Sequence, residues 1–157
     1  MGLSLKKEEM VQFLEAAKTP GEAFNCMLWG TVYADISHFQ GHSELSRMVG
    51  GFGGAGVAGS LNNAFCYIGL TGQGLYVIAL DAYNTSSITA TLAIPIANIT
   101  AIKITKGLGS YLLDIACGEP VSLTVKGTSI GTNIKDQKER MAAFIAAMEG
   151  LKARFIQ

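Results

Sequence analysis

The stretch that decides the fold begins with two apolar runs, AFCYIGL at residues 64–70 and LYVIAL at residues 75–80. The four residues between them, Thr71-Gly72-Gln73-Gly74, signal a turn, because glycine adopts backbone conformations that other residues avoid. Each run is too short for a helix and is rich in β-branched and aromatic side chains, which favour strands. The stretch therefore predicts a β-hairpin.

The next run continues this pattern as far as residue 104. Its clearest part alternates strictly and places Ile88, Ala90, Leu92 and Ile94 on one face. Alternation of this kind is typical of a half-buried strand.

Further strands are predicted on both sides of the hairpin, at residues 23–34, 98–106, 111–116 and 121–126. The first of them has large apolar groups on both faces, which predicts that it is covered on two sides. It is also expected to bend at Gly30, since a glycine within a strand often marks a bulge. Short strands with regular turns between them indicate an antiparallel sandwich or barrel.

Two segments have helical periodicity instead. Residues 1–20 contain a short amphipathic helix that ends at Thr19-Pro20-Gly21, because proline disfavours the helical conformation in the residue before it. Residues 134–156 form a second helix, and we expect its apolar stripe to cap the sheet. That stripe consists of Met141, Phe144, Ile145, Met148, Leu151 and Phe155. The predicted fold is mainly β (α+β), with about seven antiparallel strands, a C-terminal capping helix and an extra N-terminal helix.

The composition indicates one domain whose surface is partly covered. A chain of 157 residues can bury a full core, so we treat 1–157 as a single domain. Charged residues make up only 15% of it, against about 25% in typical soluble domains. A surface so poor in charge predicts contact with a sister subunit, another protein or lipid. The 12 basic and 12 acidic residues cancel, which argues against nucleic-acid binding.

Residues 36–62 are predicted to form a Gly-rich insertion loop. No charged residue occurs between Met48 and Leu80, and glycines in a helix would cost about 1 kcal/mol each. Residues 51–56 fit the dinucleotide fingerprint G-x-G-x-x-G, but the strand, helix and acidic residue that this site needs are missing around them. We interpret the loop as flexible or as contacting another subunit, with shallow membrane insertion as the alternative. Phe52 and Val57 are its candidate contact residues.

Candidates for catalysis or metal binding are weak. Cys26, Cys66 and Cys117 are far apart and lie within apolar runs, which indicates buried thiols in a reducing compartment. His38 and His42 are four residues apart but lack the glutamate of a metalloprotease motif, so solvated histidines are favoured. We therefore expect no catalytic residues, no metal and no cofactor.

Three lysines on late strands are the remaining site candidates. Lys103, Lys106 and Lys126 form either a mild basic patch that faces anionic lipid or an acidic partner, or ordinary solvated lysines that protect a sheet edge.

Several short motifs resemble the bacterial PH-like and GRAM-like (pleckstrin-homology-like) domains. Residues 26–30 read CMLWG in an early strand. Residues 67–78 are similar to that group's Leu-Thr-x-x-x-Leu-Tyr hairpin, and residues 94–99 to its Ile-Pro-x-x-x-Ile turn. The resemblance covers roughly residues 23–155. It implies a capped barrel that binds or assembles without chemistry and is often oligomeric.

One difference from the phosphoinositide-binding members concerns basic residues. Those members have a Lys and Arg cluster on the first two strands and their loop, whereas residues 23–70 here offer only Arg47. Inositol phosphate binding is therefore not expected.

The sequence leads to three functional hypotheses. The first is a non-enzymatic PH-like module that acts through protein–protein or peripheral membrane contact, as a homo-oligomer. Its expected location is cytoplasmic, because the N-terminus lacks the apolar core of a signal peptide. The second is a small-molecule-binding domain with the Gly-rich loop as a lid. An enzyme ranks third.

Overall fold

The computed structural model describes residues 7–35, 49–51, 60–81, 88–107, 110–117, 122–128 and 136–154. These residues form two α-helices, a short 3-10 helix and eight strands. The helices are α1 (Lys7–Ala17), η2 (Ile96–Asn98) and α3 (Gln137–Ala153). The strands are β1 (Phe24–Asp35), β2 (Val49–Gly51), β3 (Ser60–Thr71), β4 (Gly74–Leu80), β5 (Ile88–Pro95), β6 (Ala101–Gly107), β7 (Ser110–Ala116) and β8 (Ser122–Thr128).

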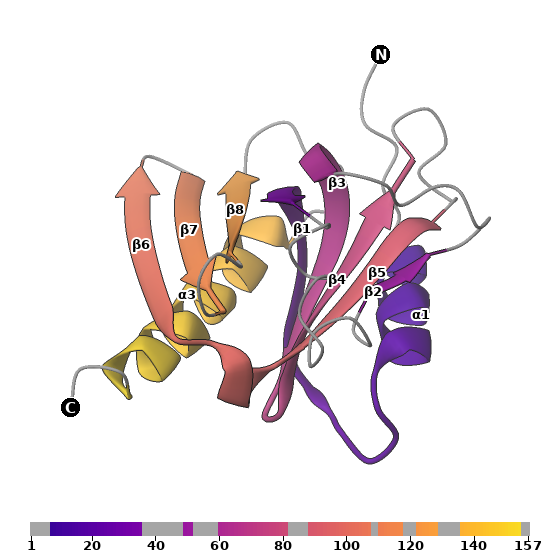
Figure 1. Cartoon of the computed structure of the whole chain (residues 1–157), viewed down its shortest axis with the longest axis horizontal. Helices are drawn as coiled ribbons and strands as arrows, with labels where there is room; N and C mark the ends of the chain where they lie inside the picture. Colours follow the sequence, from indigo (N-terminus) through magenta and orange to yellow (C-terminus); the bar gives the residue numbers. More distant parts are fainter. Residues whose placement is uncertain are drawn as a thin grey trace.

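The strands form a single antiparallel sheet in the order β2-β5-β4-β3-β1-β8-β7-β6. Strands β3, β4 and β5 follow one another as hairpins, and so do β6, β7 and β8 (Figure 1). Strand β1 joins the two groups because it pairs with β3 along most of its length and with β8 only over residues 31–34. The structure confirms the predicted mainly β fold with its N-terminal and C-terminal helices.

Helix α3 fills the larger of two cores. Phe144 and Met148 are fully buried, and Met141 and Leu151 are nearly so. They pack against apolar side chains from both groups of strands, among them Leu28, Ile68, Val77, Leu92, Ile102, Leu113, Ile115, Leu123 and Val125. Burying side chains of this size stabilises a fold by about 1.5 to 3 kcal/mol each, as an upper estimate. The predicted capping stripe is confirmed for these residues, while Phe155 lies outside the described part.

Helix α1 forms the second core on the other face of β1, β3 and β4. Met10 and Leu14 are fully buried there, and Figure 1 shows α1 and α3 at opposite ends of the molecule. Their strand partners are Trp29, Tyr67, Tyr76, Ile78 and Leu80. Strand β1 therefore contributes to both cores, as its two apolar faces predicted.

The predicted single apolar face of residues 88–94 is interrupted. Leu92 and Ile94 belong to the α3 core, whereas Ile88 packs in the α1 core. The cause is a register shift between β4 and β5, where Ala79 pairs with Ala90 but Leu80 pairs with Ile88. Because side chains alternate along a strand, one extra residue moves Ile88 to the opposite face.

Gly30 has a different role from the predicted bend. Pairing between β1 and β3 is continuous through Gly30, and the irregularities fall between Phe24 and Cys26 and between Val32 and Ala34. A Cβ atom at Gly30 would lie 2.7 Å from the backbone oxygen of Lys126. The glycine therefore allows the backbones of β1 and β8 to approach closely.

The predicted insertion loop at residues 36–62 contains strand structure at two places. Residues 49–51 form β2, which pairs with residues 90–92 of β5, and β3 already begins at Ser60. The predicted loop therefore included residues that belong to strands, at 49–51 and 60–62. A glycine-rich segment can still add a short edge strand when a partner strand supplies the hydrogen bonds. Residues 36–48 and 52–59, which include His38, His42, Phe52 and Val57, lie outside the described residues.

Candidate functional site

A surface groove of about 580 Å³ lies where β1 meets β8 and β7. Its lining comes from strands β1, β3, β6, β7 and β8 and comprises Trp29, Thr31, Phe65, Thr105, Lys106, Gly107, Ser110, Tyr111, Leu112, Lys126 and Gly127. Its volume falls within the range of about 300 to 1,000 Å³ that is usual for small-molecule sites.

The strand register builds this groove by aligning residues from five strands. Thr31 pairs with Phe65 on one side and with Lys126 on the other. Lys126 pairs with Leu112, and Leu112 pairs with Thr105. Directly paired residues place their side chains on the same face of a sheet. These five side chains therefore form one row across the face, and we call this face of β1, β8, β7 and β6 the row face.

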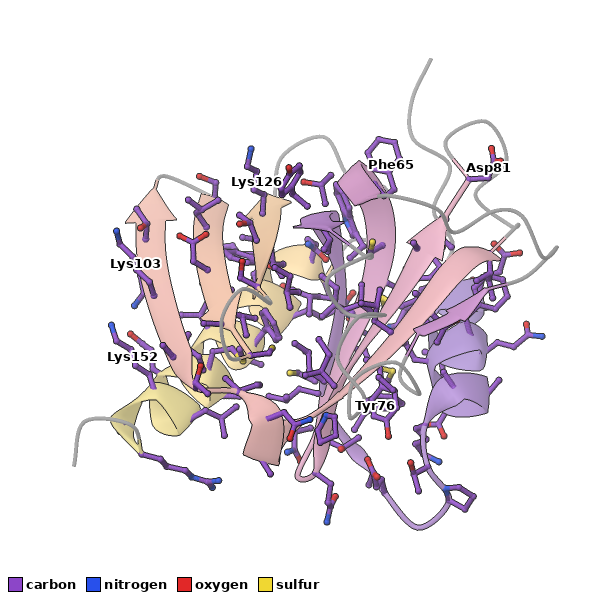
Figure 2. The ribbon with its side chains drawn as sticks, in the orientation of Figure 1. Phe65, Tyr76, Asp81, Lys103, Lys126 and Lys152 are labelled. Atoms are coloured by element: carbon purple, nitrogen blue, oxygen red, sulfur yellow. The ribbon has the colours of Figure 1, made fainter. Side chains whose placement is uncertain are left out.

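The floor of the groove is apolar and its rim is polar. Trp29 is buried, with 5% of its surface exposed, and Phe65 and Leu112 are partly buried. Thr105, Ser110 and Lys126 are exposed at the rim. An apolar lining with a few polar groups is the usual composition of a ligand site. In Figure 2, Phe65 and Lys126 lie at the same end of the sheet.

Tyr111 pairs with Gly127 and alternates with Leu112, so its ring lies on the opposite side of the sheet, in the α3 core beside Phe144. A Cβ atom at Gly127 would overlap the Tyr111 ring, so only glycine leaves room for the tyrosine. The Tyr111 hydroxyl is buried, and no residue that the structure describes accepts or donates a hydrogen bond to it. Burial raises the pKa of Tyr111, so this hydroxyl is neutral and keeps its donor.

The three predicted lysines occupy different environments. Lys126 and Lys106 both line the groove, but the Lys106 ammonium forms an ion pair with Glu149 of α3 at 3.0 Å. Lys103 pairs across the strands with Asp114, one row away from Lys126 on the same face. Within the described ranges, the Lys126 ammonium forms no ion pair. The predicted patch is thus divided, and Lys126 is its free charge at the groove.

The first turn of α3 contributes a contact that the sequence did not predict. The Gln137 side chain donates from Nε2 to the backbone oxygen of Trp29 at 2.8 Å and accepts from its backbone nitrogen at 3.5 Å. Arg140 donates to the backbone oxygen of Met27 at 2.9 Å. These side chains provide hydrogen bonds to the edge of β1 before Thr31, where β1 is no longer paired with β8. A glutamine and an arginine at a helix start carry no sequence signal for this role.

A second polar cluster connects the α1–β1 segment to the β3–β4 turn. Glu22 accepts hydrogen bonds from the hydroxyls of Thr71 at 2.6 Å and Tyr76 at 2.9 Å. The Thr71 hydroxyl also accepts from the backbone nitrogens of Gln73 and Gly74, which fixes the predicted turn. The hydrogen bond from Thr71 is the main reason that the pKa of Glu22 is lowered from its usual value. The neighbouring pocket of about 340 Å³ is smaller than the groove.

The three cysteines are free and buried, as predicted. Burial raises the pKa of Cys26 and Cys117 to about 11 and raises that of Cys66 as well. Thiols in this state are poor nucleophiles, because the thiolate is the reactive form. No group of three or more His, Cys, Asp or Glu residues suited to a metal ion occurs in the described part of the chain.

No protein-family model matches the sequence, and no curated protein matches it. A solved structure, the hSac2 domain from human phosphoinositide phosphatase Sac2, is similar with a TM-score of 0.48 and 12% sequence identity. The match covers 96% of this chain and 85% of that chain. None of the described helices is long and apolar enough to cross a lipid bilayer.

Proposed function

We propose that this chain is a non-enzymatic binding module of the PH-like and GRAM-like kind, which acts through protein–protein or peripheral membrane contact. Two antiparallel groups of strands followed by a C-terminal helix support the PH-like assignment. Burial of all three thiols supports a role without covalent chemistry.

The proposal rests on the exposure of the row face. Over β8, β7 and β6 neither described helix covers this face: α3 packs against the opposite side of β6 and β8, and α1 covers the same face only where it continues over β1, β3 and β4. Lys103, Thr105 and Lys126 on this face are exposed, and Leu112 beside them is only partly buried. Such a face, with a groove across it, is suited to a partner that covers apolar surface and meets a positive charge.

The experiment measures self-association and membrane binding of the intact chain. Molar mass is determined by light scattering, and sedimentation with vesicles is compared between phosphatidylglycerol-containing and pure phosphatidylcholine membranes. We expect an oligomer or binding to the anionic vesicles, and we expect Lys126→Glu to weaken that association. Lys138→Glu, an equal charge change at an exposed position of α3, serves as the control. A monomer that ignores both vesicle types, or an effect of Lys138→Glu equal to that of Lys126→Glu, contradicts the proposal.

A second candidate function is small-molecule binding, which the recessed floor of the groove favours. Trp29 is too deeply buried to be reached by a flat surface, but a small molecule within the groove contacts the lining that it forms with Phe65 and Leu112. The part of residues 36–62 that was predicted to act as a lid lies largely outside the described residues. The groove itself is formed by strands, which hold such a site more firmly than a loop does.

A further inference from the structure

We propose that the groove binds one molecule of a monomeric anionic amphiphile, a compound with a single negative group and an apolar body. This inference rests on the second candidate function and names its ligand class. Lys126 pairs with the anionic group, and the apolar body lies along the floor formed by Trp29, Phe65 and Leu112.

The depth of the apolar residues favours a single molecule over a bilayer. Membrane-inserting surfaces present large apolar side chains outward, where they can reach the lipid. Among the residues that the structure describes, Tyr33 is the exposed large apolar side chain, and it does not line the groove. Trp29, Phe65 and Leu112 are instead buried or partly buried. A monomer fits between strands that a bilayer surface cannot enter.

The charges around the groove favour one negative group. Glu149 offsets the charge of Lys106 at 3.0 Å, so Lys126 is the lining cation that a ligand can neutralise. The carboxylate of Asp114 accepts a hydrogen bond from Thr124 at 2.9 Å and belongs to the neighbouring row, not to the groove lining. One available cation at the rim of an apolar groove is complementary to a monoanion.

Hydroxyl groups can complete the recognition of the ligand head. Thr31, Thr105 and Ser110 line the groove close to Lys126 in the strand register, and their hydroxyls can donate to an anionic oxygen. Hydrogen bonds to a charged acceptor are stronger than those to a neutral one. The head group is therefore expected at the Lys126 end, with the apolar body directed toward Trp29.

Trp29 is the single tryptophan of the chain and lines the groove, so its fluorescence reports on binding there. The intact protein is titrated with dodecanoate and, separately, with dodecyltrimethylammonium, both below micelle formation, while Trp29 emission is recorded. We expect dodecanoate to bind with one-to-one stoichiometry and to change the emission. The cationic compound has the same chain length and is expected to bind about tenfold more weakly or less.

Two variants locate the charge and the apolar contact. Lys126→Glu is expected to weaken dodecanoate binding about tenfold, whereas Lys138→Glu leaves it unchanged. Leu112→Asp places a carboxylate on the groove floor and is expected to abolish binding of the apolar body. Circular dichroism and urea unfolding of each variant show that the fold is retained. If Leu112→Asp does not fold, Lys126→Glu and the two probes still decide the question.

The outcomes separate this inference from the proposed function. Three results would each overturn the inference. They are unchanged Trp29 emission with dodecanoate, equal affinity for both probes, and an affinity for dodecanoate that Lys126→Glu does not alter. If Lys126→Glu nevertheless weakens self-association or sedimentation with vesicles, the proposed contact function stands while the ligand class is wrong. Emission changes produced by phosphatidylglycerol vesicles but not by free dodecanoate would assign the groove to a membrane and also overturn the inference.

Discussion

Gln137 pairs with both backbone groups of Trp29, although 108 positions separate the two residues in the chain. Gln137 is 1% exposed, and its amide takes the place of a neighbouring strand where β8 is no longer paired with β1. Trp29 also lines the groove. The start of α3 therefore fixes the strand position on which one end of the groove depends.

Replacing Gln137 by Leu should destabilise the fold by about 3 kcal/mol. The leucine fills a similar volume but leaves the backbone N–H and C=O of Trp29 without their partner, and each such group costs about 1 to 3 kcal/mol. Urea unfolding monitored by circular dichroism measures the effect. Lys138→Ala, at the adjacent exposed position, should change the free energy of unfolding by less than about 0.5 kcal/mol. Equal stability of the two variants would show that the Gln137 contact is not needed.

Gly127→Ala should cost about 1 to 3 kcal/mol, because the new methyl group overlaps the ring of Tyr111. The added substitution Tyr111→Leu should recover part of this loss, so the double variant is more stable than the sum of the single changes predicts. Gly150→Ala is the control. Nothing lies within 4 Å of a Cβ atom at Gly150, so that change should stabilise α3 by up to about 1 kcal/mol. Purely additive effects at Gly127 and Tyr111 would contradict the proposed overlap.

Acid should remove the contribution of Glu22 to stability. The hydrogen bond from Thr71, followed by those from Tyr76 and Thr19, lowers the pKa of Glu22 in the folded chain below the ordinary value of 4.5. The unfolded chain then binds more protons in this range, so the contribution is present above about pH 4.5 and is lost as the pH falls through the folded pKa. Urea unfolding of the native protein and of Glu22→Gln, compared from pH 7 down to pH 3, measures this difference.

Asp136 also has a lowered pKa, mainly through its hydrogen bond with Arg140, so its contribution is lost on acidification as well. Its contribution is common to both proteins and cancels in the comparison. We therefore expect the stability difference between the native protein and Glu22→Gln to shrink below pH 4.5. A difference that stays constant down to pH 3 would mean that the Glu22 cluster does not hold the carboxylate in its charged form.

The cysteines should react slowly while the protein is folded. With a pKa of about 11, Cys26 and Cys117 are ionised to the order of one part in a thousand at pH 8, and Cys66 is fully buried. A chromogenic disulfide reagent at pH 8 should label all three thiols quickly in guanidinium chloride and only slowly without it. Rapid labelling of one thiol in the folded protein would identify an activated cysteine and reopen the enzyme hypothesis.

The sequence predicted the elements that depend on local pattern. The turn at residues 71–74 follows from its glycines, and the burial of Phe144 and Met148 follows from helical spacing. The helix ends lie within the predicted segments, since α1 spans Lys7–Ala17 and α3 spans Gln137–Ala153. Periodicity is enough for these features because each depends on residues that are close in the chain.

Features that depend on distant pairing could not be predicted in this way. The groove exists because Thr31 pairs with Phe65 and with Lys126, and no local pattern specifies that register. The position of Ile88 depends on a single register shift against β4. Lys106 is separated from Lys126 because Thr105 occupies the Lys126 row, so Lys106 lies on the opposite face and meets Glu149 from a helix far along the chain. Sequence patterns therefore identified the lysines but not their different environments.

The most direct test of the groove as the binding site is a nuclear magnetic resonance titration of the intact ¹⁵N-labelled protein with dodecanoate. The indole N–H of Trp29 gives a single side-chain signal, and the amides of Thr31, Ser110 and Lys126 report on the rim. We predict that these signals shift together and saturate, while the amides of Gln73 in the β3–β4 turn and Lys152 in α3, neither of which lines the groove, stay in place. Shifts confined to Gln73 and Lys152, with Trp29 and Lys126 unchanged, would contradict the account.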